Sequence, residues 1–268
     1  MPFTISHAAA VLPLPRKRLP LSALVVGSMA PDFPYFVLLS DVSRIGHTIP
    51  GLFIFCIPVG MATLWLFHRY LKLPLLALAP NSLRSRIPAQ ATFRFFPVWR
   101  FLLIAICVLL GAVTHILWDG LTHLNGIFVA HWPALRLVSP FWPYQPLFSL
   151  LQHFSSVIGL LLLVSAYLRW TRKTPPTSET TVPPLSTATK IRTFAWGILL
   201  VAAIGIISGC HFALRQPHIW KEVFIIRTVI GGMAGGIVSV AVYATWWHIR
   251  MRKAPEAMAP EASVSSVR

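Results

Sequence analysis

Five long apolar segments constrain what this chain can fold into. Residues 48–67 contain no charged side chain over twenty positions, which is enough for a helix to cross a hydrocarbon core of about 30 Å. Four further segments have a similar character. They cover residues 101–118, 147–168, 193–214 and 223–247. With 56% hydrophobic and 11% charged residues, the chain is not a soluble domain, and we predict an all-α, polytopic membrane helix bundle.

The segment before the first of these spans is interrupted. Residues 19–39 are apolar, but Pro31, Asp32 and Pro34 divide them, and two prolines around an aspartate break a helix. About twelve apolar residues precede the break, whereas a span needs about twenty. We therefore predict five spanning helices plus N-terminal short or re-entrant helices. A complete span over residues 19–39, which would give six, is the alternative.

The strong positive charge of the chain has a distribution typical of membrane proteins. The 268 residues include 23 Lys and Arg but 7 Asp and Glu, a net charge of +16, which in a soluble protein would suggest a nucleic-acid partner. Most of the cations lie between the spans, above all in residues 69–100. This positive-inside pattern predicts a membrane protein in contact with membrane lipid, with no nucleic-acid partner.

The same pattern divides the chain into regions. We predict a membrane-embedded helical domain over residues 1–170 and a flexible basic linker, rich in proline and threonine, over residues 171–192. A two-helix membrane hairpin over residues 193–249 follows, with closely spaced glycines that allow close helix packing. Residues 250–268 are rich in Ala, Pro and Ser and are expected to be disordered. The oligomeric state is left open.

The second span ends in ionisable residues at helical spacing. His115, Asp119 and His123 stand at i, i+4 and i+8, and because each step of four advances by about 40°, they lie along one stripe. Ionisable side chains at membrane depth are costly unless they face protein, water or a metal, and His and Asp are ligands that zinc accepts. The stripe predicts either a divalent metal site or a hydrogen-bonded contact between packed helices.

Five separated motifs give the chain a recognisable likeness. They are Thr4-Ile5-Ser6-His7, Gly27-Ser28-Met29-Ala30-Pro31-Asp32, Gly46-His47-Thr48, His115-x-x-x-Asp119 and Leu150-Leu151-Gln152-His153. Over about residues 1–170 the chain resembles a bacterial membrane family defined only as a domain of unknown function, number 4184. It is more distantly similar to YdjM-like membrane-bound metal-dependent hydrolases and to zinc-dependent phospholipase C. The resemblance implies a protein of the bacterial cytoplasmic (inner) membrane.

The resemblance implies a set of metal ligands drawn from these motifs. The candidates are His7, Asp32, His47, His115, Asp119 and, less directly, His123 or His153. Phospholipase C holds a cluster of zinc ions, but its later His-x-x-x-Glu motif is missing here, because Val157 stands four residues after His153. One or two divalent ions, with zinc as the metal, are therefore expected. The charge pattern places these residues at the non-cytoplasmic face, and His7 joins them only if the N-terminal helices are re-entrant.

A metal-dependent hydrolase is the function that the resemblance implies. Bound zinc lowers the pKa of its water from 15.7 toward about 7, with Asp32 or Asp119 as bridging ligand or proton acceptor. At a membrane face the expected substrate is a lipid headgroup ester or another phosphoester. The alternative is a non-catalytic metal-binding or metal-transporting membrane protein. A structural protein with hydrogen-bonded polar helix ends is the third possibility.

Overall fold

The structure is a computed structural model in which the described part of the chain is helical. It describes residues 3–15, 18–37, 45–88, 93–140, 142, 144–177 and 182–258, with the backbone alone for residues 36–37 and 253–258. Within these ranges no β-strand forms, and one isolated bridge joins Val138 to Pro146. The all-α class predicted from the sequence is confirmed.

Among the residues that the structure describes, five helical segments are long and apolar enough to cross a membrane. They are Ile49–Leu78, Val98–His131, Leu147–Lys173, Thr187–Ala213 and Pro217–Arg252. Each contains one of the apolar segments recognised in the sequence, apart from a single end residue in two of them, so the prediction of five spanning helices is confirmed by length and composition. The uninterrupted helices among them are α9 (Leu147–Lys173), α10 (Thr187–Ala213) and α11 (Trp220–Met258).

The first span is assembled from several helical pieces. In order these are α3 (Ile49–Gly51), η4 (Leu52–Cys56), α4 (Ile57–Leu66), η5 (Phe67–Leu71) and α5 (Lys72–Leu78), followed by α6 (Asn81–Arg84). Both η4 and η5 are π-helical. Pro58 lies in the first turn of α4, and because proline has no amide hydrogen, the widened turn before it accommodates a break in the hydrogen-bond ladder.

The N-terminal region consists of short helices, as predicted. They are η1 (Thr4–Val11), α1 (Leu21–Met29), η2 (Ala30–Asp32), α2 (Phe33–Val37) and η3 (Ile45–His47). Pro31 stands within η2, so the helix of α1 does not continue through the Pro-Asp-Phe-Pro sequence. Residues 21–37 therefore do not form one spanning helix, and the six-span alternative is not supported by the described residues.

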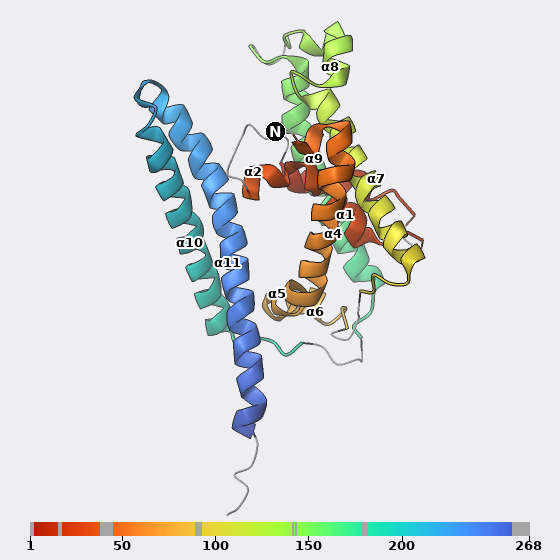
Figure 1. Ribbon diagram of the computed structural model, residues 1–268, viewed down its shortest axis with the longest axis vertical. Helices are drawn as coiled ribbons and strands as arrows, with labels where there is room; N and C mark the ends of the chain where they lie inside the picture. Colours follow the sequence, from red (N-terminus) through yellow and green to blue (C-terminus); the bar gives the residue numbers. More distant parts are fainter. Residues whose placement is uncertain are drawn as a thin grey trace, which may run out of the picture. The chain divides into compact units, whose positions relative to one another are not determined.

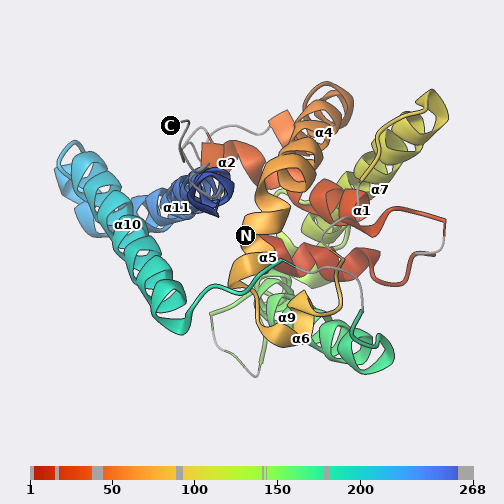
Figure 2. The same ribbon diagram turned by 90° about the horizontal axis from the view of Figure 1, so that it is seen from below.

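The chain separates into two compact units. The first comprises residues 1–68 and 85–178, and the second comprises residues 69–84 and 179–268. In the first unit α1 packs on α7 (Val98–Thr122), and η1 packs on both α1 and α9. Figure 1 and Figure 2 both show α1 beside α7. The core of this unit gathers Val11, Leu24, Leu64, Ile104 and Val108, all fully buried.

The second unit is dominated by the antiparallel pair of α10 and α11 (Figure 1). A Cβ atom placed on Gly235 would lie 3.0 Å from the Cα of Val201, and one placed on Gly205 would lie 2.8 Å from the carbonyl oxygen of Thr228. The glycines thus allow the two backbones to approach closely, as the sequence predicted. α11 continues to Met258; residues 259–268 of the expected tail and 178–181 of the expected linker lie outside the described residues.

Candidate metal centre

Two glycines bring α1 against α7 at the depth of the polar stripe. A Cβ atom on Gly111 would lie 2.6 Å from the backbone nitrogen of Ser28, and one on Gly27 would lie 2.7 Å from the Cα of Val108. Only residues without a side chain permit this approach. As a consequence, the carbonyl oxygen of Ser28 reaches His115 and accepts a hydrogen bond from its Nδ1 at 2.8 Å.

Two further close approaches bring the N-terminal histidines and Asp32 toward α7. A Cβ atom on Gly46 would lie 2.8 Å from the Cα of Pro31, so η3 packs directly on η2 and His47 comes to lie beside Asp32. On the other side, the hydroxyl of Ser6 donates to the carbonyl oxygen of Ser156 at 2.8 Å. This bond fixes η1 on α9 and positions the adjacent His7 against α7.

Asp32, His47, His115 and Asp119 form what we call the four-residue cluster. Each offers one ligand atom, and all four atoms lie within 4.8 Å of one another. Nε2 of His115 is 3.4 Å from Oδ1 of Asp32 and 3.3 Å from Oδ2 of Asp119. Nε2 of His47 is 3.6 Å and 3.3 Å from the same two oxygens. Two imidazoles and two carboxylates therefore converge on one point.

The protonation of His115 indicates that a cation is needed where the four ligand atoms converge. Because the carbonyl oxygen of Ser28 can only accept, Nδ1 of His115 carries the proton, and in a neutral imidazole Nε2 then presents a lone pair to two carboxylate oxygens. Nε2 of His115 and Oδ1 of Asp32 are buried and make no hydrogen bond within the described residues. A buried lone pair facing carboxylates is repulsive unless a cation lies between them.

The spacing of the cluster favours a metal over a proton as that cation. A charge-assisted hydrogen bond would draw the nitrogen and oxygen to about 2.7–2.9 Å, whereas the distances here are 3.3–3.6 Å. Zinc bonds of about 2.0–2.1 Å in a tetrahedron place neighbouring ligands about 3.3–3.4 Å apart. The four nitrogen–oxygen separations of the cluster are thus close to those around one zinc-like ion, and the donor atoms have the chemistry that such an ion needs.

The surroundings of the cluster hold it in a charged, oriented form. Asp32 is 1% exposed and His115 is fully buried, and the hydroxyl of Thr4 donates to Oδ2 of Asp32 at 2.7 Å. Burial raises the pKa of Asp32, but a positive charge on the neighbouring His115, together with the Thr4 hydroxyl, outweighs it and brings that pKa below its ordinary value. Asp32 is therefore an ionised carboxylate, the form that binds a cation.

His7 lies beside the cluster, on the other oxygen of Asp119. Its Nε2 is 3.4 Å from Oδ1 of Asp119, and its ring stacks on that of His115 with centroids 3.9 Å apart. Neither ring nitrogen of His7 makes a hydrogen bond within the described residues. Burial lowers the pKa of His7 to about 4, so the ring is neutral at neutral pH and offers a lone pair.

His123 reaches Asp119 by a different route from the one predicted. The helix ends at Thr122, and His123 has extended backbone angles as its C-cap, so the predicted stripe applies to His115 and Asp119 but not to the third residue. Nδ1 of His123 lies 3.6 Å from Oδ1 of Asp119 and 3.2 Å from the carbonyl oxygen of that residue. His123 thus flanks the four-residue cluster on the same side as His7.

The structure does not bring His153 to the cluster. Its side chain is exposed on α9, and its Nδ1 donates to the carbonyl oxygen of Ser149 at 2.7 Å, one turn earlier in the same helix. No described contact joins it to any of the other candidate ligands. The inclusion of His153 among the metal ligands has no support from this arrangement, because its ring is turned back along α9 toward Ser149.

Thr4 and Ser28 are the supporting residues that sequence reasoning missed. Both stand within the quoted motifs, but one acts through a hydroxyl aimed at Asp32 and the other through a backbone carbonyl aimed at His115. A backbone carbonyl leaves no signal in the residue type. For Thr4, the sequence signal that could have indicated a supporting role is a hydroxyl three residues before His7.

Replacing Thr4 by valine is expected to weaken metal binding by about tenfold. The change removes the hydrogen bond that orients Asp32, and loss of such an outer-shell partner costs roughly 10- to 100-fold in metal affinity. Zinc titration with a competing chelator measures the effect. Thr187→Val, an exposed position at the start of α10, is the control; equal affinity in Thr4→Val and the wild type would show that Asp32 needs no such support.

Comparisons with known proteins agree with the motifs quoted from the sequence. Searches of curated proteins and of solved structures gave no match. The profile of one family, described as Domain of unknown function (DUF4184), matches residues 1–245, which extends the likeness from the first 170 residues through α10 and most of α11. The more distant likeness to YdjM-like hydrolases and phospholipase C stays a prediction. With more than nine-tenths of its length covered, the chain belongs to the DUF4184 family.

Proposed function

We propose that the four-residue cluster binds one divalent metal ion, zinc, and that the chain is a membrane-bound metal-dependent hydrolase. The observation that carries the proposal is the convergence of four side-chain nitrogen and oxygen atoms, of which Nε2 of His115 and Oδ1 of Asp32 are buried and make no hydrogen bond within the described residues. Two imidazole nitrogens and two carboxylate oxygens are a donor set that suits zinc. The three cysteines are free and lie outside the cluster, so no thiolate competes for this role.

The residues around the cluster supply the groups that hydrolysis requires. When bound, such an ion acts as a Lewis acid and makes water a nucleophile at neutral pH. The side chains of His47 and His123 are 21% and 29% exposed, so the cluster is open to water on their side. His7 and His123 both approach Oδ1 of Asp119, where they can orient a substrate oxygen and hold or pass on a proton.

An apolar cavity beside the cluster favours a lipid ester as substrate. The cavity has a volume of about 470 Å³ and lies between α7 and α9, where Trp118, Thr122, Phe128 and Leu151 line it. Trp118 also meets the ring of His7 edge-on, with centroids 5.4 Å apart. An acyl chain in this cavity would bring its headgroup ester toward His7 and His123. This is the basis for proposing a lipid or phosphoester substrate.

One observation favours the alternative of a non-catalytic metal site. The cluster provides four protein ligands, and four ligands complete a tetrahedron, as in structural zinc sites, whereas catalytic sites keep one position for water. A hydrolase based on this cluster therefore requires a fifth ligand position or the release of one carboxylate during turnover. Activity is the property that separates the two functions.

Zinc-loaded wild-type protein in detergent is expected to release product from phospholipid or phosphodiester substrates. His115→Ala is expected to reduce the rate of product release by at least about 100-fold, because loss of a catalytic metal removes several kcal/mol of transition-state stabilisation. His153→Ala, which replaces an exposed histidine outside the cluster, is the matched control and should retain full activity. Zinc binding without turnover of any substrate would favour the non-catalytic function. A rate that His115→Ala leaves unchanged would come from a contaminating enzyme.

A further inference from the structure

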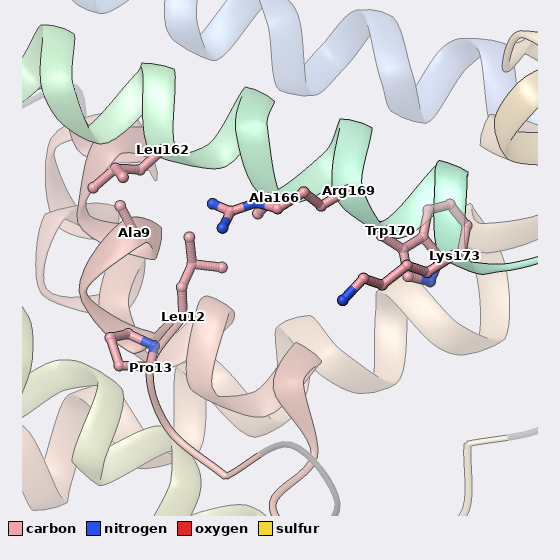
Figure 3. A pocket seen from close by; sticks show the side chains of 8 residues that line it. All are labelled: Ala9, Leu12, Pro13, Leu162, Ala166, Arg169, Trp170 and Lys173. Atoms are coloured by element: carbon pink, nitrogen blue, oxygen red, sulfur yellow. The ribbon is translucent and has the colours of Figure 1, made fainter.

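A second cavity lies in the first unit, between η1 and α9. It has a volume of about 510 Å³, and its lining combines apolar side chains with two cations. Figure 3 shows the lining residues, which are Ala9, Leu12, Pro13, Leu162, Ala166, Arg169, Trp170 and Lys173. Thirteen residues of helix separate Arg169 from Ser156, where η1 is fixed on α9, a distance of about 20 Å along the axis. None of the residues that line the cavity belongs to the four-residue cluster.

Within the described residues, no carboxylate forms an ion pair with the two cations of this cavity. Arg169 and Lys173 stand four residues apart on α9, hence on one face of the helix, and Figure 3 shows both side chains extending from α9 toward the side on which Leu12 lies. Nε of Arg169 donates to the carbonyl oxygen of Ser165 at 3.3 Å. The described carboxylates of this unit are Asp32 and Asp119, and both belong to the cluster.

The position of these cations along α9 corresponds to the headgroup level of a bilayer. Residues 147–168 contain no Lys, Arg, Asp or Glu; at 1.5 Å per residue they cover about 33 Å, the thickness of the hydrocarbon core. With residues 147–168 across that core, Arg169 and Lys173, which follow within five residues, would reach the level of the lipid phosphates. Ala166 and Leu162, one and two turns earlier, line the same cavity at the level that the acyl chains would occupy.

We propose that this cavity binds an anionic phospholipid. The phosphate of the headgroup would accept hydrogen bonds from Arg169 and Lys173, with the planar guanidinium able to donate two in parallel. The first carbons of an acyl chain would lie against Leu12, Leu162 and Ala166. The charge of the two cations and the apolar wall beneath them complement the two parts of such a lipid. The proposal does not depend on metal binding or on hydrolysis.

Native mass spectrometry of the full chain in a non-ionic detergent tests this site. The probes are phosphatidylglycerol and phosphatidylcholine with the same acyl chains. Phosphatidylglycerol is expected to bind more tightly than phosphatidylcholine. The double variant Arg169→Gln/Lys173→Gln is expected to weaken phosphatidylglycerol binding by about tenfold or more, because each cation near a membrane surface contributes about fivefold in affinity. Arg172→Gln removes an exposed cation from the same turn but not from the cavity. Its affinity for phosphatidylglycerol is expected to stay within about twofold of the wild-type value.

A second variant tests the cavity rather than the charge. Ala166→Phe keeps both cations and fills the space beneath them, so it is expected to weaken phosphatidylglycerol binding about tenfold with unchanged elution on gel filtration, because an acyl segment loses its apolar contact. Three results would overturn the proposal: an equal loss in Arg172→Gln, full binding in Ala166→Phe, or complete displacement of the lipid by inorganic phosphate. The first would indicate a general surface charge and the last a site for free phosphate.

Discussion

Zinc is expected to raise the unfolding temperature of the wild-type chain and to leave that of Asp119→Asn unchanged. Asp119 is the residue on which the centre depends most, because Oδ2 faces His47 and His115 while Oδ1 faces His7 and His123. At about 100 times its dissociation constant, a ligand that binds the folded state alone stabilises it by about 2.7 kcal/mol. For a chain of this size that corresponds to roughly 5–10 °C.

Thermal unfolding in detergent, with and without zinc, measures this difference. Glu222→Gln makes the same carboxylate-to-amide change at an exposed position in the first turn of α11, and it should show the full wild-type shift. If zinc stabilised Asp119→Asn as much as the wild type, the ion would bind elsewhere on the chain. Addition of a chelator to the wild type should reverse the shift.

Gly111→Ala is expected to destabilise the chain by about 1–3 kcal/mol and to lower its zinc content. The new methyl group would lie 2.6 Å from the backbone nitrogen of Ser28 and in contact with the carbonyl oxygen of Leu24, and such overpacking forces backbones apart at that cost. Since Ser28 orients His115 through its carbonyl oxygen, separation of α1 from α7 would also disorganise the metal centre.

Gly236→Ala is the matched control for this prediction, with an expected effect of opposite sign. No atom lies within 4 Å of a Cβ placed there, so alanine should stabilise α11 by about 0.5–1 kcal/mol through its better helix propensity. Unfolding temperature and zinc content of both variants provide the comparison. Wild-type stability and full zinc content in Gly111→Ala would show that the α1–α7 approach is not what positions His115.

The periodicity of the sequence was sufficient to predict part of the site. His115 and Asp119 stand one turn apart in an uninterrupted helix, and they meet as helical geometry requires. The same periodicity failed for His123, because the helix ends one residue before it. A helix end depends on the backbone partners of its last carbonyls, which the spacing of polar residues does not reveal.

The remaining ligands could not be located from local pattern alone. Asp32 and His47 come from short helices far from α7 in sequence, and a close approach at Gly46 brings them together. Their grouping was predicted from the resemblance to a family rather than from helix geometry. The same resemblance also selected His153, whose ring instead bonds to Ser149 on its own helix. The fold class was easier to predict, since span length and charge are properties of the sequence itself.

Elemental analysis of the purified full chain tests the metal centre most directly. After dialysis against a weak chelator, the wild type is predicted to retain about one zinc ion per chain, since the four-residue cluster forms one closed donor set. His115→Ala/Asp119→Ala should retain almost none, and His153→Ala should match the wild type. Equal metal content in the double variant and the wild type, or near-zero content in both, would contradict a metal centre at Asp32, His47, His115 and Asp119.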